Sequence, residues 1–138
     1  MAFKYRIKTK RSGVGDKIAK FHAVPVHSGE VSTRQLAREL MHISSLSEGD
    51  VLSTLTGLSD LVGWYLCQGH TVRLDGLGLL SVSASSAGYD DPAECTARRV
   101  KAKKICFRAA TVLKEQLKLI RFEREKEKTL PKEETAGE

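Results

Sequence analysis

Residues 71–82 read "TVRLDGLGLLSV", a run of leucines and β-branched residues that is interrupted by Gly76 and Gly78. A glycine-rich loop that binds phosphate leads into a helix, whose N-terminus faces the anion, and it often has the form GxGxxG. Here strand-forming residues follow the second glycine, so both glycines are better explained as positions where a strand bends. The stretch therefore favours a sharply bent strand over a nucleotide-binding loop.

The length and composition are those of a small globular protein. A chain of 138 residues is long enough for one domain and too short for two. No stretch approaches the roughly 20 apolar residues of a membrane span, and the N-terminal "MAFKYRIKTKR" lacks the apolar segment of a signal peptide. The three cysteines are an odd number and form no CxxC pair, so we expect neither a disulfide framework nor a metal site. We therefore expect a cytoplasmic protein without membrane contact.

The charge is unevenly distributed along the chain. The net charge is +6, and residues 1–22 carry seven basic and one acidic side chain. Residues 23–98 carry four basic and nine acidic side chains, and residues 99–125 carry nine and three. Basic segments of this kind are typical of nucleic-acid binding, but solvated helix faces have the same composition, so charge alone leaves both readings open.

The N-terminal segment has the pattern of a β-strand. Residues 4–10 alternate Tyr5, Ile7 and Thr9 with basic residues, which is the period of a half-buried strand with one basic face. The following "KIAKFHAVPVHSGEVS" also looks extended, and Pro25 within it favours an edge position or a bulge. These two segments are candidates for pairing with each other.

Two helices are expected next. Ser32 is placed to cap a helix over residues 33–44, in which apolar residues recur on one stripe. Ser47, with Asp50 three residues later, resembles a capping box that opens a second helix running to about Gln68. The second helix has an apolar surface broad enough to need partners on more than one side.

Strand character returns over residues 71–85. Residues 85–104 have no apolar period and predict an exposed excursion that turns near "YDDPAE". A final helix is expected from Cys106, because apolar residues recur at helical spacing from Ala109 to Ile120. Alternating charge beyond this point predicts a solvated helix end and then a disordered tail.

The order of these elements resembles that of the bacterial histone-like HU and integration host factor family, over residues 33 to about 118. The sharpest motif is "VRLDGLGLLSVS", similar to the family's strand that turns at its glycines into an arm hairpin. The second is "KKICFRAATVLKEQLK", similar to the family's return strand. There an aromatic and a basic residue, here Phe107 and Arg108, lead into the last helix.

The resemblance implies an α+β fold. It consists of two N-terminal helices, a three-stranded antiparallel sheet with a protruding β-arm, and a C-terminal helix, all in an intertwined dimer. An extra N-terminal β segment makes the chain similar to the longer HU-related proteins. We therefore expect a β extension over residues 1–31, an HU-like DNA-binding domain over residues 32–120, and a charged helix end and tail over residues 121–138.

The resemblance also implies an architectural protein of the nucleoid. Such a protein binds duplex DNA as a homodimer through phosphate contacts, with little sequence specificity, and bends or compacts it. The residues implied for DNA binding are Arg98, Arg99, Lys101, Lys103, Lys104 and Arg108, with Pro92 as the wedge. Those implied for the dimer core are Leu58, Leu61, Val62, Leu77, Leu79 and Phe107.

The arm departs from the family pattern. Its outgoing leg "SASSAGY" is neutral, its tip "YDDPAE" is acidic, and Ala109 and Ala110 replace the family's proline–glycine link. A second hypothesis therefore stays open, a structural or protein-interaction module that keeps the fold without binding DNA. Under both hypotheses the protein is not an enzyme, because the sequence has no GxSxG elbow or comparable catalytic motif. We expect no cofactor, metal or small-molecule substrate.

Overall fold

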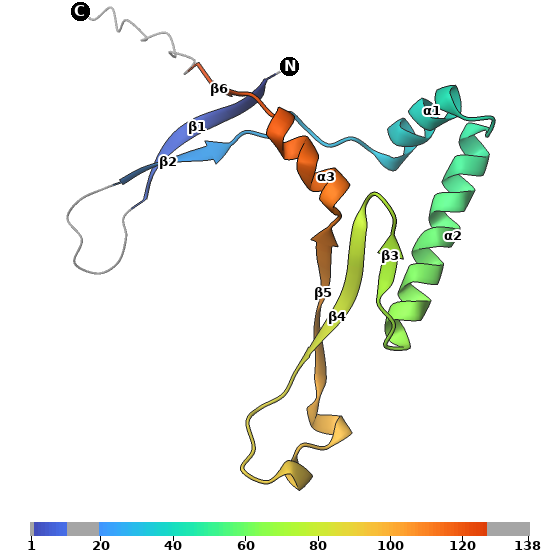
Figure 1. Cartoon of the computed structure of the whole chain (residues 1–138), viewed down its shortest axis with the longest axis vertical. Coiled ribbons are helices and arrows are strands. Elements are labelled where there is room, and N and C mark those ends of the chain that lie inside the picture. Colours follow the sequence, from blue (N-terminus) through green and yellow to red (C-terminus); the bar gives the residue numbers. More distant parts are fainter. Residues whose placement is uncertain (1, 11–19, 127–138) are drawn as a thin grey trace, which may run out of the picture. The chain divides into compact units, whose positions relative to one another are not determined.

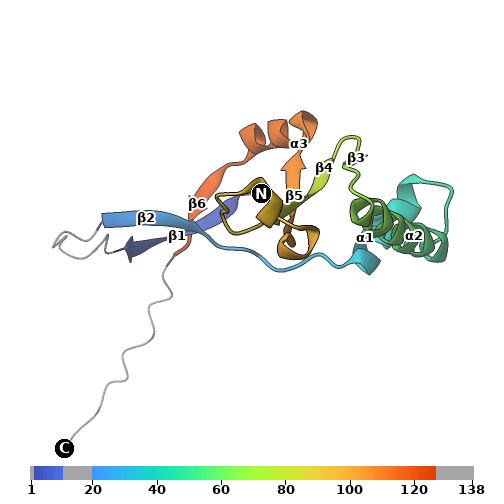
Figure 2. The same cartoon turned by 90° about the horizontal axis from the view of Figure 1, so that it is seen from below.

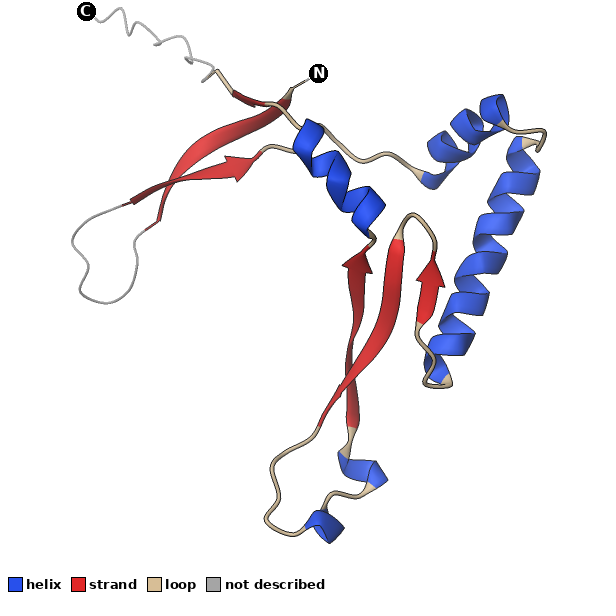
Figure 3. Ribbon diagram, viewed as in Figure 1, coloured by secondary structure: helices blue, strands red, loops and turns tan. Residues whose placement is uncertain are grey.

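The computed structural model describes residues 2–10 and 20–126, and the chain divides into two compact units (Figure 1). The terminal-sheet unit comprises Met1–Glu30 and Ile120–Glu138, and the helix–sheet unit comprises Val31–Leu119. The described chain is a mixture of helices and two three-stranded sheets, as an α+β fold requires (Figure 3). The finer domain limits given above stay a prediction.

The terminal-sheet unit contains strands β1 (Phe3–Lys10), β2 (Lys20–Pro25) and β6 (Phe122–Arg124) in the order β2-β1-β6 (Figure 2). β1 pairs antiparallel with β2 and parallel with β6. The predicted N-terminal strand and its pairing partner are therefore confirmed. Pro25 ends an edge strand, where a missing backbone donor is tolerated.

The expected helix end after residue 121 is wrong, because β6 occupies this position. The Phe122 ring lies 5.6 Å from the ring of Phe3 and 6.5 Å from that of Tyr5, measured between centroids. Arg6 and Glu125 form an ion pair of 2.9 Å beside them. These contacts fix the segment against β1, and they cannot be seen in the local charge pattern that suggested a helix. The predicted tail beyond residue 126 lies outside the described residues.

The two helices of the helix–sheet unit are confirmed. Helix α1 (Thr33–Ile43) is capped by Ser32, whose hydroxyl accepts a hydrogen bond from the backbone N–H of Gln35. Helix α2 (Glu48–Cys67) begins with the expected capping box. The helices pack through the buried Ala37 and Val51, and an ion pair of 3.4 Å joins Arg38 to Glu48.

Strands β3 (Val72–Leu74), β4 (Gly78–Ser85) and β5 (Lys101–Ala109) form an antiparallel sheet in the order β3-β4-β5. Gly76 has a φ of 80° in the turn between β3 and β4, a conformation that favours glycine. The Phe107 ring covers Gly78, where a Cβ would lie 2.8 Å from it. The glycines therefore allow a tight turn and a close approach, as the bent-strand interpretation requires.

The segment between β4 and β5 contains two 3₁₀ turns, η1 (Pro92–Glu94) and η2 (Ala97–Arg99). The last helix begins later than expected, since α3 spans Thr111–Glu115 and continues as the 3₁₀ turn η3 (Gln116–Leu119). The prediction of a helix from Cys106 was wrong because Cys106 pairs with Ser81 in the sheet. Ile105 and Phe107 on either side favour a strand by their shape.

The helix–sheet unit buries few apolar side chains. Ala37, Val51 and Leu66 are the buried hydrophobic residues of the described chain. Many large apolar side chains on α2, the sheet and α3 are instead exposed. Within the described ranges, no helix is long and apolar enough to cross a membrane.

Candidate nucleic-acid interface

The register of the sheet aligns two arginines across its three strands. Arg73 of β3 pairs with Leu79 of β4, and Leu79 pairs with Arg108 of β5. Directly paired residues point to the same face of a sheet. Arg73 and Arg108 therefore flank Leu79 on one face. Arg108 is one of the residues that the resemblance implies for DNA binding, whereas Arg73 is not among them.

An irregularity in β5 adds two lysines to this face. Ser83 pairs with Lys104 and Ala84 with Ala102, so that Lys103 has no partner on β4. In a regular strand, residues 101 and 104 would point to opposite faces. The unpaired Lys103 changes this, because Ser85, the partner of Lys101, lies on the same face as Ser83, the partner of Lys104. Lys101 and Lys104 therefore share one face. We call the side chains of Arg73, Lys101, Lys104 and Arg108 the cationic face.

The other residues of the cationic face are compatible with an anionic ligand. Ser81, Ser83 and Ser85 share it by alternation along β4. Their hydroxyls can donate hydrogen bonds to phosphate oxygens. None of the residues of β3, β4 or β5 is acidic. The face is therefore uniformly positive or neutral along the three strands.

Lys103 is the unpaired residue within β5, and the other predicted contacts, Pro92, Arg98 and Arg99, lie at the tip of the arm, beyond the paired strands. Arg98 and Arg99 are in η2, and Pro92 begins η1. The guanidinium of Arg99 lies 5.0 Å from the centroid of the Tyr89 ring, and it donates a hydrogen bond of 3.1 Å to the carbonyl oxygen of Glu94. Arg99 therefore has intramolecular contacts that stabilise the tip.

Pro92 also has a local structural role. It occupies the first position of η1, where a fixed φ is favourable and a backbone donor is not required. Asp91 caps the turn by accepting a hydrogen bond of 3.0 Å from the backbone N–H of Ala93. The carboxylates of Asp91 and Glu94 lie within this short segment, so an approaching phosphate would meet negative charge beside the proline.

The predicted dimer core falls on different surfaces. Leu80, not Leu79, pairs with Phe107 on the face opposite to the cationic face. Leu79 shares the cationic face with Arg73 and is half-buried. The other predicted core residues are half-buried or exposed in the single chain: Leu58, Leu61 and Val62 on α2, Leu77 in the β3–β4 turn, and Phe107 on β5.

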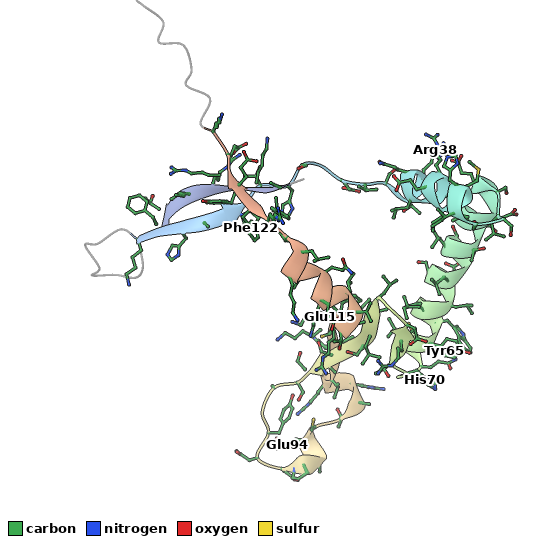
Figure 4. The ribbon with its side chains drawn as sticks, turned by 45° about the horizontal axis from the view of Figure 1, so that its top comes forward. Arg38, Tyr65, His70, Glu94, Glu115 and Phe122 are labelled. Carbon is green, nitrogen blue, oxygen red and sulfur yellow. The ribbon has the colours of Figure 1, made fainter. Side chains whose placement is uncertain are left out.

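The described residues offer no metal centre. No group of three or more histidine, cysteine or acidic residues among them could hold a metal ion. Cys67, Cys95 and Cys106 are free thiols. The Tyr65 and His70 rings lie 5.6 Å apart at the end of α2 and pack edge to face (Figure 4). In the part of the chain that the structure describes, the cationic face is the arrangement best suited to an anionic ligand.

Comparisons with known proteins bear on the family and the fold of the chain. A family model described as "HU domain fused to wHTH, Ig, or Glycine-rich motif" (HU-HIG) matches residues 1–124. No curated protein matches the chain. A solved structure from Bacteroides vulgatus ATCC 8482, described as a "Putative bacterial DNA binding protein", is similar with a TM-score of 0.62 at 11% identity. The match covers 89% of this chain and 48% of that one, so this chain spans about half the length of its structural relative, and the likeness shows the fold.

Proposed function

The chain belongs to the HU-HIG family, and from this premise we propose that it is an architectural protein of the nucleoid that binds duplex DNA as a homodimer. The proposed contacts are mainly to phosphates, so sequence specificity is low and the DNA is bent or compacted. The DNA-binding description of the structural relative, from Bacteroides vulgatus ATCC 8482, supports the same class of ligand.

The cationic face is the observation that carries this proposal. It presents Arg73, Lys101, Lys104 and Arg108 with serines between them and without an acidic residue on the three strands. Arginine, lysine and serine side chains are typical donors to phosphate oxygens, and such contacts position a protein on DNA without reading its sequence. Of the residues predicted from sequence, Lys101, Lys104 and Arg108 are therefore the proposed core of the site, with Arg98 and Lys103 beside it.

Homodimerisation is supported by the apolar surface of α2. Leu58, Leu61 and Tyr65 recur at helical spacing and are exposed in the single chain. An exposed apolar stripe of this kind marks an interaction surface. A second copy of the chain would bury it and supply the core that one helix–sheet unit lacks.

The salt dependence of DNA binding tests the proposed site. The affinity of the full chain for a generic duplex is measured over a range of salt concentrations, for the wild type and for Lys101→Ala/Lys104→Ala. Each phosphate contact that is lost should reduce the slope of log K against log salt by about 0.9. The double variant should therefore lose up to about 1.8 of slope, with similar losses for unrelated sequences.

The matched control is Lys114→Ala/Lys118→Ala, which removes two cations from α3 and η3. It should leave the slope unchanged. Equal slopes for the wild type and Lys101→Ala/Lys104→Ala would remove the cationic face from the interface. Wild-type binding that is undetectable at low salt would contradict the proposed function itself.

The acidic tip favours a second candidate function, a structural or protein-interaction module with an HU fold. Asp90, Asp91 and Glu94 lie near the end of the arm, which in this candidate contacts a protein partner and not DNA. This candidate predicts a folded homodimer that has no salt-dependent affinity for duplex DNA. Energy transfer between labels at the DNA ends adds a second readout, since an architectural protein should shorten the end-to-end distance.

A further inference from the structure

The terminal-sheet unit ends in a two-stranded ribbon. The β1–β2 ladder runs from the pair Tyr5 and Pro25 to the pair Lys10 and Lys20. β6 pairs with β1 only over Phe3–Tyr5. Beyond Tyr5, the described sheet therefore consists of two antiparallel strands, which we call the terminal ribbon (residues 6–10 and 20–24).

The two faces of the terminal ribbon differ in chemistry. Lys8 pairs with His22, and alternation places Arg6 and Lys20 on the same face. Ile7 and Phe21 lie on the opposite face, paired with Ala23 and Thr9 respectively. Lys8, Lys20 and His22 are exposed, so their side chains can reach a ligand.

The positive charge of this face is compensated at one end only. Arg6 is held by Glu125, and Glu123 lies opposite Lys4 where β6 joins the sheet. Neither β1 nor β2 contains an acidic residue. Within the described chain, the ion pairs involve neither Lys8 nor Lys20. Lys8 and Lys20, which have no ion-pair partner among the described residues, therefore lie in the part of the ribbon that does not pair with β6.

We propose that the terminal ribbon is a second DNA-binding surface, in which Lys8 and Lys20 bind phosphates and His22 can donate a hydrogen bond. This inference rests on the proposed function and adds a binding site outside the helix–sheet unit. Two paired strands lie about 4.8 Å apart, and the major groove, about 12 Å wide, admits a two-stranded β-ribbon. The ribbon therefore has dimensions and charge that complement duplex DNA.

The test uses the full chain and the double variant Lys8→Ala/Lys20→Ala. Its slope of log K against log salt should be up to about 1.8 smaller than that of the wild type, because two phosphate contacts are lost. Circular dichroism should be unchanged, since both side chains are exposed and lie outside the aromatic cluster of Phe3, Tyr5 and Phe122. Lys8→Arg/Lys20→Arg, which keeps both charges, should bind as the wild type does.

The matched control is Arg121→Ala/Arg124→Ala, which removes two cations from the same unit. Arg124 pairs with Tyr5 and therefore lies on the face opposite to Lys8. Equal losses in the control and in Lys8→Ala/Lys20→Ala would show an effect of total charge and overturn the inference. An unchanged slope in Lys8→Ala/Lys20→Ala, with a reduced slope in Lys101→Ala/Lys104→Ala, would overturn the ribbon site and leave the proposed function intact. Absence of wild-type binding would overturn both.

Discussion

Gly78 shows how one residue is fixed by its neighbours. A Cβ at this position would overlap the carbonyl oxygen of Arg108 and would also contact the Phe107 ring. Gly78 pairs with Ala109, so the two strands cannot separate at this point without losing the ladder. The sequence pattern predicts the same bending role for Gly76 and Gly78, but of these two only Gly76 has a positive φ. The two glycines meet different physical demands.

Gly78→Ala should lower the free energy of unfolding by about 1–3 kcal/mol, the usual cost of overpacking. The methyl group would force Phe107 or the β5 backbone to move. Gly88→Ala is the matched control, because Gly88 has open space around it and no positive φ. In urea denaturation, the free energy of unfolding of the control should lie within about 0.5 kcal/mol of that of the wild type. A Gly78→Ala protein as stable as the wild type would contradict the close approach.

The capping box of α2 is a second residue-scale feature. The Ser47 hydroxyl donates a 2.7 Å hydrogen bond to Oδ2 of Asp50 and accepts one of 3.2 Å from the Asp50 backbone N–H. The backbone N–H of Ser47 also donates to Oδ2 of Asp50. These hydrogen bonds, first from the side chain and then from the backbone of Ser47, lower the pKa of Asp50 below its ordinary 3.8.

Ser47→Ala should destabilise the protein by about 1 kcal/mol, as is typical for the loss of an N-cap. It should also raise the pKa of Asp50 toward 3.8, which carboxyl NMR titration can measure. Because the folded pKa is depressed, the contribution of the Asp50 carboxylate is present above pH 3.8 and is lost as the pH falls through the folded value. The stability difference between wild type and variant should therefore narrow in acid, whereas Ser45→Ala, outside the cap, should show no such trend.

At the residue scale, candidate site residues can be proposed from sequence where they share a segment or a motif. Lys101 and Lys104 belong to one basic segment, and Arg108 follows Phe107 in the return-strand motif. Arg73 stands alone among apolar residues, and only its pairing with Leu79 places it beside Arg108. Arg99 is implied for DNA binding by the resemblance, yet its guanidinium lies over the Tyr89 ring, a contact that no local sequence pattern indicates.

At the scale of elements, those with a strong local signal were predicted correctly. Helices α1 and α2 have caps and apolar stripes, and β1 has a strict alternation. β6 is three residues long and pairs with residues far away in sequence, so its contacts with β1 are invisible locally. The predicted start of α3 is too early, because apolar residues at the end of β5 fit the helical spacing of the residues that follow them.

The irregularity of β5 yields a prediction about the whole strand. Deleting Lys103 would remove the unpaired residue while Lys101 and Lys104 keep their partners Ser85 and Ser83. The deletion should therefore bind DNA as Lys103→Ala does, with the same salt slope. If the deletion instead weakens binding well below Lys103→Ala, the strand has slipped by one residue and moved lysines to the other face.

At the scale of the whole molecule, the unpaired apolar surface needs an explanation. Leu61 is 58% exposed and Phe107 is 56% exposed, in a helix–sheet unit with few buried side chains. Small domains that bury little apolar surface rarely offset the entropy of the chain. A second copy that covers α2 and the apolar face of the sheet would provide the missing burial.

We therefore predict that the chain sediments as a homodimer, with twice its mass of 15.2 kDa. Leu61→Asp should convert it to a monomer, because a charge buried without a partner costs several kcal/mol. The monomer should also lose helical circular dichroism and unfold at a lower urea concentration than the wild type, because one helix–sheet unit alone buries few apolar side chains. Ser59→Asp adds the same charge about 200° away around α2 and should remain dimeric. A wild-type protein that is monomeric, or a Leu61→Asp protein that stays dimeric, would exclude this face of α2 from the interface.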